Sequence, residues 1–339
     1  MNRRRFLHAV PAVASSSSFL FGERRALGEE SDGKIVLRIA TLAPNGSSWM
    51  RVFSAWNNSL KQATGNRLSL RFFAGGAAGD ERDAVLKMKA GQMDGAAVTT
   101  VGLGQMVRSI LVLQAPGVCN TYPRIDAVRH KLAAEFETAF DKAGFTLLGW
   151  GDAGLARIFS NRAVRTPADL RQARVWSWRD DPTWQSVLDA SQVTGVSLGL
   201  PEVYPALRTN RIDTFPGTAI AAIAFQWHTQ VTHITKDSQA VVIGATVIKK
   251  EKFDALPGDL KAALVETSQQ AHRALARTIR QDDQKAFDTI VQRGATAEDL
   301  TGEAAAWLPV LQTARQSLVG KLFSAELLAR VEQIAHEVE

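Results

Sequence analysis

Hydrophobic positions recur along this chain with two periods, and their order predicts an α/β fold. In the first hundred residues, apolar runs typical of strands lie at 34–40, 67–73 and 92–99, and helical spacing is found at 49–63 and 81–90. Strands that alternate with helices in this way predict a layered sheet with right-handed crossovers. Ligands of such sheets lie beyond the carboxyl ends of the strands, which places Asn45, Ser47, Trp49 and Thr99 near a candidate site.

The middle of the chain has a second group of the same kind. Strands are predicted at 145–150, 158–160, 174–178, 212–215 and 239–249, and helices at 126–143, 182–190, 201–209 and 217–227. Pro205 is expected to make the helix at 201–209 start late or kink. The run at 239–249 is long enough to return the chain to the first group of strands. We therefore expect two α/β domains.

Helical spacing then continues from about 257 to 293, with Pro257 at the start and Gly294 at the stop. A helix of that length measures roughly 54 Å, more than the width of one domain, so we expect it to lie across both. Two shorter helices, at 304–318 and 325–336, follow. The predicted organisation is a leader at 1–28, domain I at 29–153 plus about 240–256, domain II at 154–239, and the long and C-terminal helices at 257–339.

The segment from Arg174 to Trp184 is rich in tryptophan, with Trp176, Trp178 and Trp184 among the eight tryptophans of the chain. As a strand it would place Arg174, Trp176 and Trp178 on one face. A guanidinium beside flat apolar rings suits an amphipathic small molecule. The alternative is a core strand with an arginine at its edge, and the segment alone does not decide between the two.

Composition and charge narrow the classes of function. With 339 residues and 45% hydrophobic content the chain can bury a large core. Its single cysteine, Cys119, excludes an internal disulfide and a cysteine-built metal site. The formal charge is +6, but residues 1–28 carry +4 of it, so the rest is nearly balanced. Basic residues do not gather among aromatic ones, which argues against nucleic acid.

The first 28 residues have the pattern of an export signal. Arg3, Arg4 and Arg5 precede Phe6-Leu7, as in the twin-arginine signal, and a short, serine-diluted apolar segment follows. Ala26-Leu27-Gly28 is a candidate cleavage site, which would start the mature protein near Glu29. The alternative is a disordered basic tail. We expect a mature protein that is soluble in the periplasm.

The motifs of catalysis are weak or missing. Gly149-Trp150-Gly151-Asp152-Ala153-Gly154 matches the dinucleotide fingerprint, but 155–167 predicts strand and turn where that fold needs a helix. The histidines lack metal-ligand spacing, and adjacent carboxylates such as Asp282-Asp283 do not face each other on a helix. We expect no enzyme activity, no cofactor and no metal.

Several segments together resemble one family over some 200 residues. They are Gly79-Asp80-Glu81-Arg82, Ser160-Asn161-Arg162, Thr166-Pro167-Ala168-Asp169-Leu170, Glu202-Val203-Tyr204, Ala206 to Asp213, and Leu256-Pro257-Gly258-Asp259-Leu260. In this order they resemble the periplasmic substrate-binding proteins of TRAP (tripartite ATP-independent periplasmic) transporters, DctP type. The segments 175–182 and 224–228 more specifically resemble the subgroup that works with a periplasmic TPR-repeat partner.

The resemblance implies a hinged cleft between two α/β domains and a ligand carboxylate held by an arginine. Arg174 follows the Thr-Pro-x-Asp-Leu turn, where the family has this arginine, and Arg157 lies just before Ser160-Asn161-Arg162. The family's asparagine after the Ile-Asp strand is missing, since Phe215-Pro216-Gly217-Thr218 stands there. That departure, with the tryptophans, favours a larger or more apolar acid than a small dicarboxylate.

We therefore expect a solute-binding receptor of a TRAP-type transporter that captures an organic acid by closing its cleft. The predicted ligand-binding residues are Arg174, Arg157, Trp176, Trp178, Phe215, Gly217, Asn45, Ser47, Trp49 and Thr99. The expected partners are a small-molecule ligand, the TRAP membrane subunits and a TPR-repeat protein. The alternative is an interaction protein for the TPR-repeat partner that binds a lipid-like ligand without pairing a carboxylate.

Overall fold

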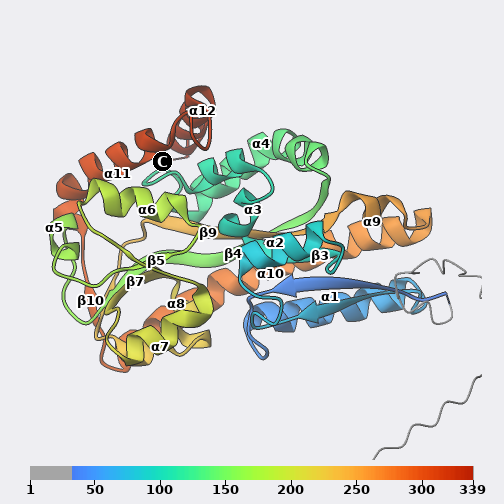
Figure 1. Cartoon of the computed structure of the whole chain (residues 1–339), viewed down its shortest axis with the longest axis horizontal. Helices are drawn as coiled ribbons and strands as arrows, with labels where there is room; N and C mark the ends of the chain where they lie inside the picture. The colour runs from blue at the N-terminus through green and yellow to red at the C-terminus, as the bar shows by residue number, and fades with distance from the viewer. Residues whose placement is uncertain (1–32, 339) are drawn as a thin grey trace, which may run out of the picture. The chain divides into compact units, whose positions relative to one another are not determined.

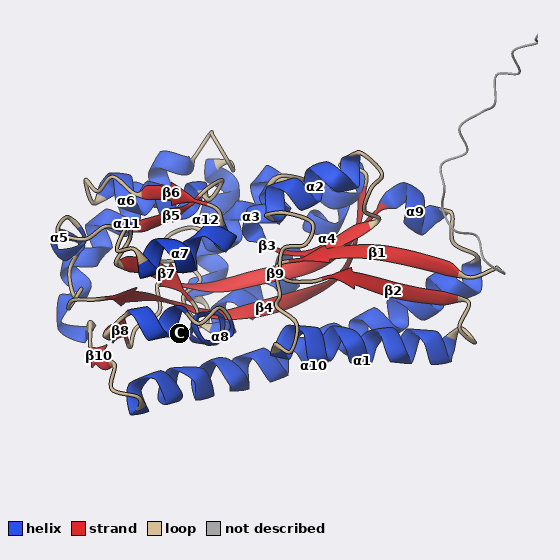
Figure 2. Ribbon diagram, turned by 60° about the horizontal axis from the view of Figure 1, so that its bottom comes forward, coloured by secondary structure: helices blue, strands red, loops and turns tan. Residues whose placement is uncertain are grey.

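The central element of the fold is a mixed sheet to which distant parts of the chain contribute strands (Figures 1 and 2). The computed structural model describes residues 33–338, and the predicted leader lies outside them. The sheet has the order β10-β8-β4-β9-β3-β1-β2, and β7 also pairs with β4. Its strands are β1 (Ile35–Thr41), β2 (Leu68–Phe73), β3 (Gly95–Thr99), β4 (Phe145–Ser160), β7 (Thr214–Gly217), β8 (His233–Thr235), β9 (Ala240–Lys249) and β10 (Thr296–Glu298). The parallel pairing of β1 with β2 and β3 agrees with the predicted α/β layer.

Strands β4 and β9 form the long antiparallel pair that links the two groups of strands. They pair from Phe145–Lys249 to Ala156–Ala240, and the register shifts between Leu147 and Gly149 and between Asp152 and Gly154. We predicted two strands, at 145–150 and 158–160, where the structure has one of 16 residues. Glycines and Asp152 lie between the two predicted strands. Because glycine and aspartate are depleted in strands, the sequence did not predict a continuous strand there.

The glycines that match the dinucleotide fingerprint serve the packing of a helix. Strand β4 continues through them, so no helix follows them, as the sequence indicated. A Cβ atom at Gly149 would lie 2.5 Å from the ring of His272, and one at Gly151 would lie 2.8 Å from Leu275. Both partners belong to the long helix α10 (Gly258–Gln292). The missing side chains therefore let α10 approach the middle of β4 closely.

Helices cover both faces of the sheet. In Figure 2, α1 (Ser48–Ala63) and α10 run side by side beneath the strands, and these two helices pack against each other. The apolar face of α1, with Trp49, Phe53, Trp56 and Leu60, is buried. The other helices are α2 (Glu81–Lys89), α3 (Thr100–Gly104), α4 (Tyr122–Lys142), α5 (Pro167–Leu170), α6 (Pro182–Ala190), α7 (Val203–Arg208), α8 (Ala219–Ala224), α9 (Lys250–Asp254), α11 (Ala304–Leu318) and α12 (Ala325–His336).

A second, smaller sheet holds the tryptophan-rich segment. It pairs β5 (Trp176–Trp178) in parallel with β6 (Val196–Leu198). Short 3-10 helices complete the chain: η1 (Arg108–Gln114), η2 (Leu200–Glu202), η3 (Trp227–Gln230) and η4 (Thr301–Glu303). Among residues 33–338 no helix combines the length and the apolar character that a membrane span requires.

Candidate functional site

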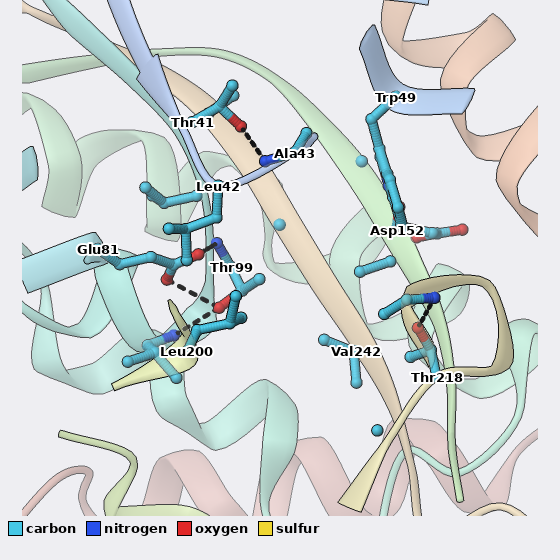
Figure 3. Close-up of a pocket in the computed structure, with 18 of the residues that line it drawn as sticks. Thr41, Leu42, Ala43, Trp49, Glu81, Thr99, Asp152, Leu200, Thr218 and Val242 are labelled. Carbon is cyan, nitrogen blue, oxygen red and sulfur yellow. Dashed lines mark hydrogen bonds between the residues drawn. The ribbon is translucent and has the colours of Figure 1, made fainter. Parts of the chain in front are cut away.

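A cavity of about 190 Å³ lies where the ends of several strands meet the long helix (Figure 3). It is bordered by the end of β1 and the loop after it, by the junction of β3 and α3, by the middle of β4 and β9, and by His272 and Leu275 of α10. From the middle of the chain, β5, η2, α8 and η3 close it. Its lining includes the aromatic side chains Trp49, Phe53, Trp176, Trp178, Phe225 and Trp227.

The short strand β5 directs two tryptophans into this wall. Trp176 and Trp178 are two residues apart and therefore share a face, and their rings stack at 5.9 Å. Trp227 of η3 meets Trp176 edge to face at 5.5 Å. Trp176 and Trp227 are each only 3% exposed, so the two rings belong to the core and to the cavity wall at once. The two interpretations of this segment given above are therefore compatible.

The indole N–H groups of these tryptophans are used within the protein. Trp49 donates to the carbonyl of Asp152 (3.2 Å), Trp176 to the carbonyl of Leu198 (3.1 Å), and Trp178 to Oδ2 of Asp80 (3.1 Å). This part of the wall therefore offers a ligand ring surfaces and few hydrogen-bond donors. Such a surface favours contact with apolar groups of the ligand.

Glu81 is the most deeply buried carboxyl group of the wall without a basic partner. It begins α2, next to the N-cap Asp80, and reaches the end of β3. Oε1 accepts the N–H of Thr99 (2.8 Å), and Oε2 accepts the hydroxyl of Thr99 (2.9 Å) and the N–H of Gly102 (2.7 Å), as Figure 3 shows for Thr99. Burial raises the pKa of Glu81 to about 7 despite these hydrogen bonds.

Two other carboxyl groups line the cavity in different environments. Asp181 is the N-cap of α6 and accepts the N–H groups of Thr183 and Trp184; burial raises its pKa. Asp152 of β4 is paired with Arg129 (2.9 Å) and Arg280 (2.6 Å), so its charge is compensated from behind the wall.

His272 adds a polar ring that carries no charge near neutral pH. Its Nδ1 lies 2.7 Å from the carbonyl of Ser268, and its Nε2 lies 2.8 Å from the hydroxyl of Thr246. The carbonyl can only accept, so Nδ1 donates and Nε2 accepts from the hydroxyl. Burial lowers the pKa of His272 to about 4, which leaves the imidazole neutral.

The lining residues of this cavity, taken from the described part of the chain, include neither lysine nor arginine. Arg174, expected to face the ligand, does not border the cavity. Its guanidinium pairs with Oδ2 of Asp213 at 2.9 Å, and the side chain is 53% exposed. The N–H of Arg174 also donates to Oδ1 of Asp213 (2.9 Å). This double contact directs Arg174 away from the face that Trp176 and Trp178 share.

Arg157 is also engaged elsewhere. It lies in β4, buried, with its guanidinium 3.6 Å from Asp283 and stacked 4.6 Å over the ring of Phe287, both on α10. Burial lowers the pKa of Arg157, and its Nε atom has no hydrogen-bond partner among the described residues. Arg157 borders a neighbouring cavity of about 110 Å³ that shares Gln114, Asp181, Gly217 and Val242 with the larger one.

Of the other predicted ligand-binding residues, five line the cavity and three do not. The five are Trp49, Thr99, Trp176, Trp178 and Gly217. Phe215 is fully buried and stacks on Phe159 at 4.8 Å, Ser47 caps α1 by accepting the N–H of Met50, and Asn45 is an exposed loop residue.

Some lining residues were not predicted from the sequence: Phe53, Glu81, Asp181, Phe225, Trp227 and His272. Glu81 and Asp181 gave a usable signal, since each stands at the start of a helix that follows a strand end. His272 gave none, because only the packing of α10 on β4 brings it to the site.

Comparisons with known proteins agree with this architecture. Residues 39–321 match the family model described as bacterial extracellular solute-binding protein, family 7. The 2,3-diketo-L-gulonate-binding periplasmic protein of Escherichia coli is 21% identical over 246 residues, 70% of this chain and 73% of that protein. The C4-dicarboxylate-binding periplasmic protein of Rhodobacter capsulatus is 22% identical and covers 68% and 70%.

Solved structures show the same fold. A sugar acid binding protein of Advenella mimigardefordensis in complex with galactonate superimposes with a TM-score of 0.84 at 15% identity, covering 90% of this chain and 99% of that one. An extracytoplasmic solute receptor of Bordetella pertussis that binds pyroglutamic acid gives 0.82 at 16%, covering 88% and 99%. This likeness confirms the predicted fold class, a two-domain α/β fold with a hinged cleft and a long helix.

Proposed function

Because the chain belongs to family 7 of the bacterial extracellular solute-binding proteins, we propose that it is the receptor of a TRAP-type transporter for an organic molecule with a largely apolar body. One observation carries this proposal: aromatic rings whose N–H groups are mostly occupied line the cavity at the strand ends. Pockets of this kind hold ligands by apolar contact and orient them by a few polar groups. The role is one of binding and not of catalysis.

The ligand class follows from what the wall offers. The similar proteins named above bind 2,3-diketo-L-gulonate, C4-dicarboxylates, pyroglutamic acid and galactonate, all organic acids. A sugar acid would leave many hydroxyl groups unpaired against the rings of Trp176, Trp178 and Phe225, which is costly. An apolar or aromatic body would instead replace water at these rings. The predicted preference for a more apolar ligand therefore gains support from the lining.

Capture by cleft closure is part of the proposal. Asp80, at the start of α2, accepts the indole N–H of Trp178 and the backbone N–H of Leu200 (3.0 Å), which joins the predicted domains I and II beside the cavity. A ligand favours closure only by contacts that it makes in the closed state and lacks in the open one. Delivery to a membrane permease from the periplasm would follow closure.

The TPR-repeat partnership stays a prediction from sequence. The segments that suggested it, 175–182 and 224–228, contribute Trp176, Trp178, Phe225 and Trp227 to the cavity wall. These rings serve the wall and the core, and Trp176 and Trp227 are buried, so they offer no exposed surface that would favour a protein partner.

The proposal is tested by identifying what the protein carries. Mature protein purified from periplasm would be examined by native mass spectrometry, and bound molecules would be extracted and identified. We expect a species with an aromatic or alkyl body, retained by wild type and by Trp307→Phe, whose indole lies away from the cavity. Trp176→Ala should retain about tenfold less of this species, because its affinity for the ligand is lower. A fully hydroxylated sugar acid bound by wild type would contradict the proposal.

A further inference from the structure

A groove of about 680 Å³ lies next to the aromatic cavity. It is bordered by the start of α2, by α3 and η1, and by β5 and the start of α6. We infer that this groove is an outer binding subsite for an organic acid, where the carboxylate is held beside Arg108 while the apolar body passes Trp178 into the cavity. The inference rests on the proposed function and adds to it a route of entry for an acid.

The groove and the cavity are adjacent, since they share the lining residues Val101, Trp178 and Asp181. Trp178 is partly exposed, whereas Trp176, on which it stacks, is buried. The ring of Trp178 therefore borders both spaces. An amphipathic ligand can place its apolar part on this ring while its polar part stays in the groove.

Three arginines border the groove, whereas the described lining of the cavity has none. Arg82 pairs with Asp180 (3.4 Å), and Arg179 pairs with Glu202 (2.7 Å). Arg108 is exposed at the start of η1, and within residues 33–338 no carboxylate pairs with its guanidinium. A ligand carboxylate can therefore bind Arg108 without breaking an existing ion pair, and the planar guanidinium suits this group.

The two aspartates that border the groove have partners of their own. Asp180 accepts a hydrogen bond from Arg82. Oδ1 of Asp181 accepts the N–H groups of Thr183 (3.0 Å) and Trp184 (3.2 Å) at the start of α6. These N–H groups and the positive end of the helix dipole offset the charge of Asp181 locally. An acid that approaches Arg108 therefore does not compete with a carboxylate of the protein for that guanidinium.

Arg108 and Arg157 act on different stages of binding. Arg157 is buried, its Nε atom has no hydrogen-bond partner among the described residues, and it borders the smaller cavity of about 110 Å³. A buried guanidinium of this kind can hold a bound carboxylate, as the sequence predicted for Arg157. An exposed guanidinium is screened by water and salt, so it raises the rate of encounter more than the final affinity. Arg108 therefore acts on the approach of the acid.

The test measures binding rates with two probes that differ in charge. Binding of 3-phenylpropionate and of neutral 3-phenylpropan-1-ol to the mature protein would be followed by tryptophan fluorescence in temperature-jump relaxation, after removal of endogenous ligand. In Arg108→Gln the carboxylate should associate and dissociate about threefold more slowly at about 10 mM salt, because the charge stabilises passage and not the bound state. Its affinity should stay within about twofold, and the rates for the alcohol should match wild type.

Salt and a second arginine provide the controls. At about 0.5 M salt the Debye length falls to roughly 4 Å, so the difference between wild type and Arg108→Gln should vanish. Arg277→Gln removes the same charge from an exposed position of α10 that borders neither space, and its rates should match wild type. Equal slowing in both variants would mean that net charge alone is responsible, which would overturn the inference.

The outcomes separate this inference from the proposed function. Unchanged rates in Arg108→Gln, or a loss of affinity as large as the slowing of association, would contradict the transit role of Arg108. Weaker binding of both probes to Trp176→Ala would support the apolar-ligand receptor whatever Arg108 does. Failure of 3-phenylpropionate to bind at millimolar concentration would also overturn the inference, and the molecule identified from periplasm would then decide the proposed function alone.

Discussion

The carboxylate of Asp213 determines which side chains of the segment 174–178 face the cavity. Arg174 and Trp176 are two residues apart in this segment. Regular alternation would put both on one face, but β5 begins only at Trp176. Before it, Asp213 binds both the backbone N–H and the guanidinium of Arg174. Asp213 therefore holds Arg174 beside its own loop, and Trp176 is the first residue of the segment that lines the cavity. No feature of the local pattern around 174–178 indicates the role of Asp213.

Replacement of Arg174 by alanine should therefore leave ligand binding nearly unchanged. The guanidinium is half exposed, so its ion pair with the buried Asp213 contributes modestly, about 1 kcal/mol of folding free energy. We expect affinity for the periplasmic ligand to stay within about twofold in calorimetry. Trp176→Ala is the matched comparison on the same strand and should weaken binding strongly. Loss of binding in Arg174→Ala alone would restore the carboxylate-pairing hypothesis.

Glu81 and His272 should give the stability of the protein two opposing pH dependences. The folded state raises the pKa of Glu81 from 4.5 to about 7, so its contribution is complete below pH 4.5 and is lost as pH rises through 7. It lowers the pKa of His272 from 6.5 to about 4, so that contribution is complete above pH 6.5 and is lost as pH falls through 4. The two changes partly cancel between pH 4.5 and 6.5.

Single variants should separate the two effects in urea unfolding. With His272→Gln, only Glu81 remains, and the variant should be more stable at pH 5 than at pH 7.5 by roughly 2 kcal/mol. With Glu81→Gln the slope should reverse, since of this pair only His272 remains. Parallel pH profiles of the two variants would show that neither group has the shifted pKa that its burial implies.

Among the elements, the pair of β4 and α10 depends on glycine. Gly149 has no strained backbone angle, so alanine there is limited only by space, and its Cβ would lie 2.5 Å from Cγ of His272. We expect Gly149→Ala to lower the free energy of unfolding by about 2–3 kcal/mol, because the helix and strand must separate. Gly258→Ala, at the first residue of α10 with nothing within 4 Å, is the control and should be neutral or slightly stabilising. Equal effects of both changes would contradict this role of Gly149.

Helices with sustained periodicity were predictable from the sequence, and several three-residue strands were not. Helices α1, α10, α11 and α12 have sustained periodicity and were predicted to within a residue or two at their ends. Strands β6, β8 and β10 have three residues each and depend on partners distant in sequence, so no local pattern could predict them. The helix predicted at 217–227 is shorter, ending where Gln226 takes a left-handed conformation before η3.

At the scale of the whole molecule, the cavity is assembled from segments that the sequence keeps far apart. The position at the strand ends was predictable from the α/β order, and so were Trp49, Thr99 and the tryptophans of β5 as candidates for it. Which charges surround these rings was not predictable. Pairings such as Arg157 with Asp283 join residues more than a hundred positions apart, and only the folded chain shows that they remove every arginine from the wall.

Closure of the cleft should depend on one hydrogen bond that joins the predicted domains. Trp178 donates to Asp80 across this boundary, while Trp184 donates to the carbonyl of Trp176 within the segment 154–239. Trp178→Phe keeps a phenyl ring at the wall and removes the indole donor, and loss of that bond should cost about 1 kcal/mol of the closed state and weaken ligand binding about fivefold. Small-angle scattering of the liganded variant should show a larger radius of gyration than wild type. Trp184→Phe loses an equivalent bond inside one domain, so its radius and affinity should match wild type, and a change of equal size in both variants would mean that the bond to Asp80 has no special part in closure.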